Sequence, residues 1–295
     1  MAEQRWRIRI RPFDAVNAVL LTAVALVCIL PMIHMLALSF SSSHAVDAKM
    51  VSLWPRELTL QPYLFVVSEG RFYRAFIVSV ERTLLGVAVN MVLTVLAAYP
   101  LSKTRRAFGA RDWYVWFFMV SILFSGGLIP WYLVITWTGL INRIWALILP
   151  GAVPVFNVIL LHNFFRQLPP EIEESALIDG ASHWTIMSRI FVPLSMPALA
   201  TLVLFCAVGH WNSWFDGMIL MSDPNRYPLQ TYLQSVLVRR DLKLISLRDL
   251  QAYIEVNQRN SNAAKIIVAM IPILACYPFL QKYFTKGIIL GSVKG

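Results

Sequence analysis

Residues 168–181 read Leu-Pro-Pro-Glu-Ile-Glu-Glu-Ser-Ala-Leu-Ile-Asp-Gly-Ala, and residues 190–193 read Ile-Phe-Val-Pro. The Pro-Pro start followed by acidic residues favours a helix, because proline fits the first helical position and carboxylates complement the positive end of the helix dipole. Gly180 is suited to end this helix, and Ser182 is suited to cap another. The stretch therefore predicts two short amphipathic helices joined by a turn. Three of their side chains are candidates for an apolar contact with another protein: Ile172, Ala176 and Ile178.

The rest of the chain is strongly apolar. Of its 295 residues, 58% are hydrophobic and 14% are charged, whereas a soluble domain has about 25% charged residues. So much apolar surface cannot be hidden in one soluble core, and a lipid bilayer must therefore be part of the solvent. The net charge is +10, but the basic residues lie at the ends of apolar runs. This placement is typical of a membrane protein and does not favour nucleic-acid binding.

A spanning helix needs about 20 mostly apolar residues, and several segments meet or approach this length. They are 15–40, 75–101, 113–138, 144–164, 194–221 and 264–284. The predicted fold class is therefore all-α, a polytopic membrane protein with about six transmembrane helices. The first segment follows a basic region but is longer than the roughly 7–15 apolar residues of a signal peptide. We expect it to be an uncleaved transmembrane helix.

The basic residues also predict the orientation of the chain. Arg5, Arg7, Arg9 and Arg11 place residues 1–13 in the cytoplasm, and the basic connection 103–111 belongs there too. An even number of helices then places the tail, residues 286–295, on the same side. The expected transmembrane domain is 14–285, with residues 165–193 cytoplasmic. The expected long extracytoplasmic loops are about 41–74 and 222–263.

The 168–193 stretch resembles the EAA loop of bacterial ATP-binding-cassette (ABC) importer permeases. The family pattern is Glu-Ala-Ala, three residues, Gly, nine residues and Ile-x-Leu-Pro. The same spacings hold here for Glu174-Ser175-Ala176, Gly180 and Ile190-x-Val192-Pro193. Ser for Ala and Val for Leu are the two departures. The alternative, an ordinary surface helix, would leave the glycine and the distal proline as coincidences.

This resemblance implies a fold and a set of contacts. The fold would be that of a type I ABC importer permease, with the cytoplasmic EAA loop docked in a groove of the ATPase subunit. The resemblance implies an ATPase-coupling role for the following residues: Glu174, Ser175, Ala176, Asp179, Gly180, Ala181, Ile190 and Pro193.

Two further stretches narrow the resemblance to carbohydrate uptake. Residues 211–216, 222–224 and 227–230 look like those of permeases of the maltose-transporter second-subunit type. The ending, 281–287 and 291–295, is similar to a branch that handles complex or modified oligosaccharides. In such systems the tail reaches toward the ATPase dimer, which would involve Lys294 and Gly295.

The resemblance also implies partners and a location. The chain would form half of a saccharide pathway in the bacterial inner membrane, beside a second permease subunit that is related or identical. A separate ATPase dimer and an extracytoplasmic solute-binding protein would complete the importer. Arginines in the outer loops favour an acidic oligosaccharide, such as one derived from alginate or pectin, although such arginines are often ordinary solvated residues. The identity and length of the saccharide do not follow from the chain.

Several polar and aromatic residues within the apolar segments are candidates for the pathway. On a continuous helix, Trp211, Trp214 and Phe215 would share one face, where flat rings suit the apolar faces of sugars. His210 and Asp216 are ionisable groups in an otherwise apolar segment, which favours a functional role. An interfacial aromatic belt and simple helix packing are the alternatives. The full candidate set is Asn90, Trp211, Asn212, Trp214, Phe215 and Asp216.

Other features are interpreted more simply. Asn90 is expected mainly to form an interhelical hydrogen bond, and His34 has no evident partner. Residues 126–130, Gly-Gly-Leu-Ile-Pro, predict a break in the third span, either a hinge or a plain kink. Cys28, Cys206 and Cys276 are far apart within apolar runs, which favours neither a disulfide nor a metal site.

Motifs that would make the chain an enzyme are missing from the sequence. It contains no GxxxxGK[ST] loop, no HExxH and no GxSxG elbow. No cofactor is expected, and ATP would be bound by a partner subunit. The competing hypotheses are an ion-coupled secondary transporter, disfavoured by the few charges within the spans, and a membrane-embedded enzyme, disfavoured by the lack of a catalytic cluster.

Overall fold

The computed structural model describes residues 12–238 and 258–292. Within these ranges every regular element is helical, and the only β-type pairing is an isolated bridge between Ser41 and Leu58. The chain divides into two compact units, Met1–Glu69 with Arg240–Val268, and Gly70–Arg239 with Ala269–Gly295. The basic N-terminus, most of the arginines of the second long loop, and Lys294 and Gly295 lie outside the described residues.

The first unit begins with the long helix α1, Pro12–Ser39, of which only Ala37 and Ser39 are buried. It continues with α2, Ser43–Asp47, and α3, Gln61–Ser68, and includes the first part of α15, Gln258–Ser292. A helix that is apolar on all sides and unburied has the character of a lipid-facing span. His34 does have a partner, contrary to the sequence interpretation: its Nδ1 lies 2.6 Å from the carbonyl oxygen of Ser52.

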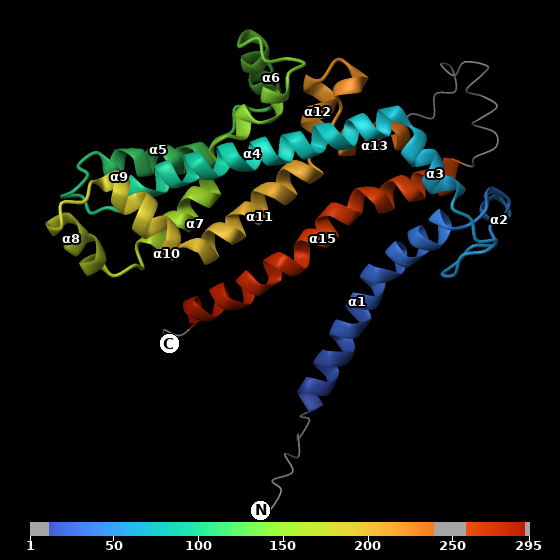
Figure 1. Ribbon diagram of the computed structural model, residues 1–295, viewed down its shortest axis with the longest axis horizontal. Helices are drawn as coiled ribbons and strands as arrows, with labels where there is room; N and C mark the ends of the chain where they lie inside the picture. The colour runs from blue at the N-terminus through green and yellow to red at the C-terminus, as the bar shows by residue number, and fades with distance from the viewer. Residues whose placement is uncertain (1–11, 239–257, 293–295) are drawn as a thin grey trace, which may run out of the picture. The chain divides into compact units, whose positions relative to one another are not determined.

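The second unit is built around α4, Gly70–Ser102, a helix of 33 residues. Two helices pack along it, α11, Met196–Asn212, and α7, Val155–Phe165 (Figure 1). The other elements of this unit are α5, Arg111–Leu123; α6, Leu128–Trp137; the 3₁₀ turns Ile144–Leu147 and Leu149–Gly151; α8, Pro170–Ile178; α9, His183–Ile186; the π-helix Met187–Phe191; α10, Val192–Leu194; α12, Phe215–Leu220; the 3₁₀ turn Pro224–Arg226; and α13, Leu229–Val238.

Helix α4 has the polarity of a membrane helix. In the middle of the helix its buried stripe is made of small and polar residues, namely Ser79, Arg82, Gly86, Asn90, Thr94 and Ala98. Its exposed side has large apolar residues such as Leu84 and Val92. Small residues allow close approach of neighbouring helices, and polar ones bond across the interface, whereas the apolar side suits lipid.

Described helices match up to five of the six expected spans, and three of these five are broken. Two described helices, α1 and α4, are long and apolar enough to cross a membrane alone. Three more spans are possible if each bent pair of helices is counted as one: α5 with α6, bent by 116°; Ile144–Gly151 with α7, bent by 49°; and His183–Leu194 with α11, bent by 82°. The first bend confirms the break predicted at Gly126-Gly127. The predicted single span 194–221 is wrong, because the helix is interrupted at Ser195 and again after Asn212.

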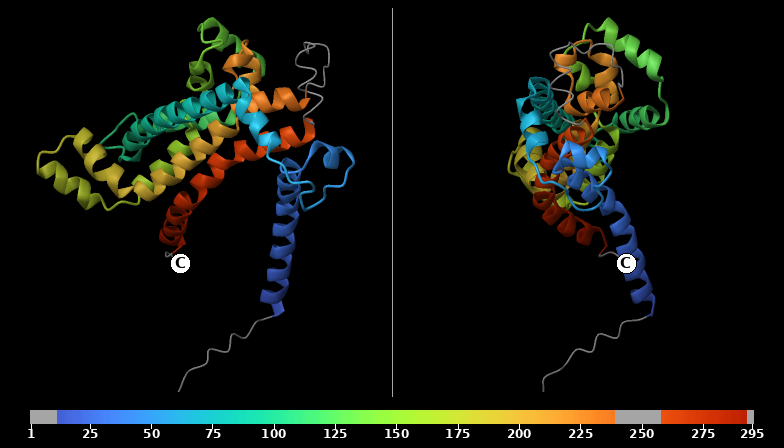
Figure 2. Two further views of the ribbon diagram at one scale, coloured as in Figure 1. Left: turned by 45° about the vertical axis from the view of Figure 1, so that its right-hand side comes forward. Right: turned by 90° about the vertical axis from the view of Figure 1, so that its right-hand side faces the viewer.

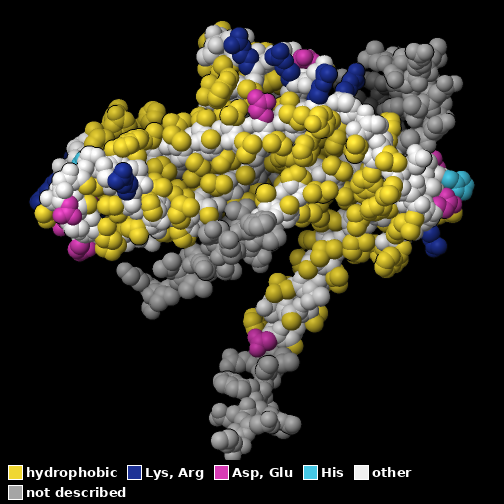
Figure 3. All heavy atoms as spheres, viewed as in Figure 1, with side chains coloured by type: hydrophobic (Ala, Val, Ile, Leu, Met, Phe, Trp, Pro, Cys, Tyr) yellow, Lys and Arg dark blue, Asp and Glu magenta, His cyan; other side chains and the backbone are white. Residues whose placement is uncertain are grey.

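The surface agrees with a bilayer environment. Figure 3 shows hydrophobic side chains over most of the long side of the second unit. Charged side chains gather near α8 and α9 and, away from these, around α6, α12 and the start of α4 (Figures 1 and 3). Seen from the side in Figure 2, the α8–α9 region projects beyond the end of α4.

Candidate functional site

A buried arginine holds three segments of the second unit together. Arg82 extends from the buried side of α4 and is only 2% exposed. Its guanidinium forms an ion pair with both carboxylate oxygens of Asp216, at the start of α12. It also donates to the carbonyl oxygens of Ser213, at 3.3 Å, and Leu147, at 3.5 Å. Arg82 therefore ties α4 to the first 3₁₀ turn and to the break between α11 and α12.

A second polar contact lies two helical turns along α4. Asn90 donates from Nδ2 to the carbonyl oxygens of Gly151 and Ala152, at 2.8 and 2.9 Å. His210 of α11 donates from Nε2 to Oδ1 of Asn90 at 2.7 Å. The two carbonyls belong to the proline-broken segment before α7, where helical hydrogen bonding is interrupted, so the amide satisfies backbone groups that would otherwise be unpaired. The predicted interhelical role of Asn90 agrees with these contacts.

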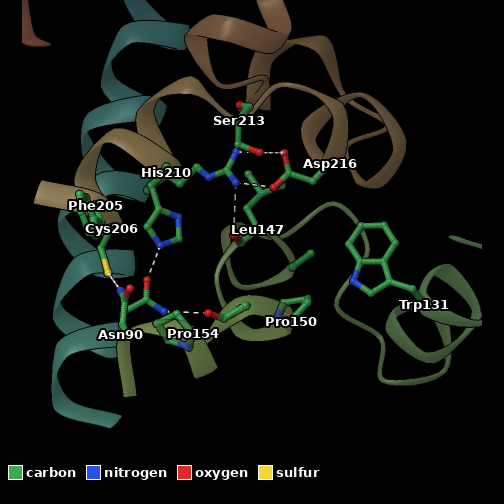
Figure 4. A pocket seen from close by; sticks show the side chains of 15 residues that line it. Asn90, Trp131, Leu147, Pro150, Pro154, Phe205, Cys206, His210, Ser213 and Asp216 are labelled. Atoms are coloured by element: carbon green, nitrogen blue, oxygen red, sulfur yellow. Dashed lines mark hydrogen bonds and ion pairs between the residues drawn. The ribbon is translucent and has the colours of Figure 1, made fainter. Parts of the chain in front are cut away.

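These polar residues surround a cavity. It has a volume of about 470 Å³, and its lining includes Arg82, Asn90, His210 and Asp216. Figure 4 shows Trp131 of α6 across the cavity from Asn90 and His210, with Pro150 and Pro154 between them. A second cavity of about 870 Å³ lies against the α5–α6 turn. The two cavities share the lining residues Trp131, Pro150, Ser213 and Asp216. A hollow of this size that is lined by charged, amide and aromatic side chains in a membrane domain is suited to a hydrophilic solute.

The structure separates the aromatic residues that the sequence grouped on one face. Helix α11 ends at Asn212, and Ser213 takes an extended conformation, with φ −69° and ψ 127°. Trp211 is buried, donates to the carbonyl of Ala269 at 3.1 Å and packs edge-on against Phe76. The shared face predicted for Trp211, Trp214 and Phe215 is therefore wrong, because the helix does not continue between them.

The other aromatic candidates lie beyond this break. Phe215 lines the larger cavity, whereas Trp214 lines neither, and both rings are partly exposed. Asn212 is exposed and also lines neither cavity. Of the six candidates, the structure brings three to the cavities: Asn90, Phe215 and Asp216.

Two lining residues, Arg82 and Trp131, were not among the pathway candidates drawn from the sequence. Arg82 is an arginine inside an apolar segment, and the rule that flagged His210 and Asp216 would have flagged it as well. Trp131 had no distinguishing signal, because the chain contains 10 tryptophans and nothing local marks the one that faces a cavity.

The second candidate site is the loop between α7 and α11. Helix α8 ends in a Schellman motif: Gly180, with φ +81°, donates to the carbonyl of Leu177, and Ala181 donates to that of Ala176. Ser182 then accepts a hydrogen bond from the backbone of Thr185 and begins α9. The two helix boundaries predicted from the sequence are thus confirmed.

Burial divides this loop into an inner and an outer face. Ala176 and Ile186 are buried in a core that also contains Phe165 and Phe191. Ala176 is therefore a packing residue, and its expected role as an exposed apolar contact is wrong. Ile178 is 86% exposed and Trp184 is 66% exposed.

The remaining coupling candidates divide in the same way. Ala181 and Ile190 pack against the inner core, because one follows the turn and the other lies in the π-helix. The candidates that remain exposed on the outer face are Glu174, Ser175, Asp179, Gly180 and Pro193.

A lysine links this loop to the end of α4. Nζ of Lys103 lies 2.7 Å from Oε1 of Glu173 in α8. Burial lowers the pKa of Lys103, and the neighbouring Glu173 carboxylate opposes that shift. Among the described residues no cluster of three or more His, Cys, Asp or Glu side chains is arranged to hold a metal ion.

The second unit has broken membrane helices around a cavity with polar lining residues. It also has an exposed loop whose inner residues pack into the core. This combination is typical of a subunit of a membrane transporter. The family model of the binding-protein-dependent transport system inner membrane component matches residues 73–290. The chain belongs to this family, and the resemblance predicted from the EAA spacing is confirmed. It is an inner-membrane component with the all-α fold of an ABC importer permease.

Individual relatives match nearly the whole chain. Protein LplC of Bacillus subtilis (strain 168) is 42% identical over 285 residues, covering 97% of this chain and 96% of LplC. The polygalacturonan/rhamnogalacturonan transport system permease protein YtcP of the same organism is 39% identical over 285 residues, covering 97% and 99%. A chain in the crystal structure of a bacterial ABC transporter involved in the import of the acidic polysaccharide alginate is also similar. Its TM-score is 0.87 at 32% identity, covering 93% of this chain and 97% of that one.

Proposed function

We propose that this chain is the permease subunit of an ABC importer that takes up an oligosaccharide. It forms half of the translocation pathway, and the loop 165–193 binds a separate ATPase. The observation that carries this proposal is the two-faced loop, whose inner residues pack into the core beside α4 while Glu174 and Ile178 remain exposed. An exposed, charged and apolar surface on a rigid turn suits a docking partner.

The substrate class is inferred from the relatives. YtcP is named for transport of polygalacturonan and rhamnogalacturonan, and the alginate importer acts on another acidic polysaccharide. In the present chain Arg82 lines the smaller cavity, but Asp216 lines it too and balances the charge of the guanidinium, so the substrate proposal rests on the relatives. We therefore favour an acidic oligosaccharide over a neutral one.

The arginines of the second outer loop contribute less to this argument than the sequence suggested. Those between 239 and 257 lie outside the described residues. Arg226, which is described, donates to the carbonyl of Asn142 at 2.5 Å, so at least one of them has a structural role.

The pathway and the partners complete the proposal. We infer that Asn90, Phe215 and Asp216 line the pathway together with Arg82 and Trp131, because all five line the two cavities. A second permease subunit, an ATPase dimer and an extracytoplasmic solute-binding protein are the expected partners. We propose that both termini lie in the cytoplasm, with 14–285 as the membrane domain and about 41–74 and 222–263 as the outer loops.

The test is ATP hydrolysis by the reconstituted complex. The chain would be coexpressed with the ATPase and the permease encoded beside it, and hydrolysis measured in proteoliposomes with the binding protein and each saccharide. Acidic saccharides should raise hydrolysis more than neutral ones of equal length. Gly180→Trp should abolish the rise, because a Cβ added at Gly180 would meet no neighbouring atom and the indole would point into the docking surface.

Gly180→Ala is the matched control. It imposes the same strain at φ +81° without the bulk, and it should keep most of the stimulation. If no ATPase copurifies and Gly180→Trp changes nothing, the importer proposal fails and an ion-coupled secondary transporter takes its place.

A further inference from the structure

The ammonium group of Lys103 is enclosed where α4 meets the exposed loop. Only 8% of its side chain is exposed, although it lies directly after the last residue of a membrane-length helix. Nζ lies 3.8 Å from the ring centre of Tyr99 and 4.0 Å from that of Phe191. Its ion pair with Glu173, at 2.7 Å, closes the remaining side. We call these four residues, Lys103, Tyr99, Phe191 and Glu173, the Lys103 joint.

The joint connects three separate elements. Tyr99 is on α4, Glu173 is on α8 and Phe191 ends the π-helix. Tyr99 and Phe191 also pack edge-on, with centres 5.2 Å apart. His183, which begins α9, lies 3.3 Å from the Tyr99 hydroxyl and 3.9 Å from Glu173. A displacement of α8 therefore acts directly on the end of α4.

The ion pair is not explained by stability alone. Burying two charges costs much of what their attraction returns, and an apolar pair of similar volume is often as stable. An ion pair between two aromatic faces restricts the position of the ammonium group, because the cation is favoured only over the rings and beside the carboxylate. Such a contact resists sliding of α8 over α4 more than an apolar contact would.

Helix α4 then reaches the cavity without interruption. Arg82 and Asn90 are on the same helix as Tyr99, and 21 residues separate Lys103 from Arg82, which corresponds to about 30 Å along the axis. The spans beside α4 are broken. Helix α4 is thus an unbroken element that contacts both the loop and the cavity.

We propose that Lys103 is a positioning residue for energy coupling: its contacts with Glu173, Tyr99 and Phe191 pass movement of the α8 loop to α4 and thereby to the cavity. The inference rests on the proposed function, since it needs an ATPase that moves α8. It differs from docking, because Lys103 and Glu173 act behind the docking surface and leave Glu174 and Ile178 exposed.

The test compares coupling in variants of the full complex. Lys103→Met retains the length of the side chain without its charge, and Glu173→Gln removes the carboxylate charge with little change of shape. Both should still copurify with the ATPase. We expect the ratio of saccharide-stimulated to basal hydrolysis to fall at least fivefold, and more ATP to be used per saccharide imported. Lys103→Arg, which keeps a cation able to stack on the rings, should recover most of the coupling.

Non-additivity separates a joint from two independent effects. If the pair acts as one unit, Lys103→Met with Glu173→Gln should lose no more coupling than either change alone. Arg106→Met is the matched control, since Arg106 is exposed and near Lys103 in sequence, and it should couple as the native chain does.

The outcomes are distinguishable. If the native complex is stimulated and both single variants stay within twofold of it, the joint is not needed for coupling, although the proposed function stands. Loss of bound ATPase in both single variants would show a role in assembly and would also overturn the inference. If the native complex itself has no ATPase or no stimulation, the proposed function fails first.

Discussion

Arg82 and Asp216 are 134 residues apart in the sequence and form a buried ion pair between α4 and α12. The arginine side chain is 3% exposed and the aspartate side chain is 19% exposed. Because Ser213 and Leu147 accept from the same guanidinium, the pair fixes the place where α11 ends. The geometry at the centre of the cavity thus depends on a contact that no local sequence signal encodes.

Breaking this pair from one side should be costly. Removal of one partner of a buried ion pair leaves an uncompensated charge, at a cost of about 3–5 kcal/mol, whereas an apolar pair can be nearly neutral. We expect Arg82→Met and Asp216→Leu each to lower the thermal midpoint of the detergent-purified complex. The double variant should be more stable than the sum of the two losses predicts. Additive losses would mean that the two side chains do not depend on each other.

Gly86 is expected to tolerate no side chain. A Cβ at this position of α4 would lie 2.4 Å from Nε2 of His210, the atom that bonds to Asn90. Gly86→Ala should displace the imidazole and destabilise the chain by about 1–3 kcal/mol through overpacking. Gly209→Ala, in the facing helix, is the control, because its Cβ would meet nothing within 4 Å. Thermal unfolding of both variants in detergent measures the difference, and equal midpoints would contradict the close approach.

Ser182 should matter through its cap. Its Oγ accepts from the backbone nitrogen of Thr185 at 3.3 Å at the start of α9, and loss of such a cap costs about 1 kcal/mol. Ser182→Ala should increase amide hydrogen exchange in residues 183–186, whereas Ser182→Asp, which retains an acceptor, should not. Unchanged exchange in Ser182→Ala would show that packing of Ile186 alone holds this helix.

The sequence correctly predicted the structural features that depend only on neighbouring residues in the chain. Gly180 and Ser182 were assigned correctly because a positive φ and a side-chain cap each involve only a few neighbouring residues. The glycines at 126 and 127 marked the break in the third span for the same reason. Apolar runs located the spans, because a bilayer requires about 20 apolar residues whatever their partners.

The structural features that the sequence did not predict depend on contacts between residues far apart in the chain. Ser213 is extended at the end of α11, and its carbonyl bonds to Arg82 rather than to a following helical turn. No proline or glycine occurs between Trp211 and Phe215, so local propensity favoured a continuous helix and a shared aromatic face. The burial of Ala176 similarly depends on a core assembled from α4, α7 and α11, which the composition of α8 does not reveal.

The tryptophans provide a test of where the solute passes. Trp131 lines both cavities, whereas Trp211 is buried against Phe76 and bonds to Ala269. Trp131→Ala should reduce saccharide import about tenfold while changing the thermal midpoint little, because its ring is only partly packed. Trp211→Ala should lower the midpoint strongly, since truncating a buried tryptophan costs about 3–5 kcal/mol. Trp214→Ala, which lines neither cavity, is the control for import. If Trp214→Ala impairs import and Trp131→Ala does not, the solute passes along the outer end of α11 and the cavity between α4 and α6 is not its route.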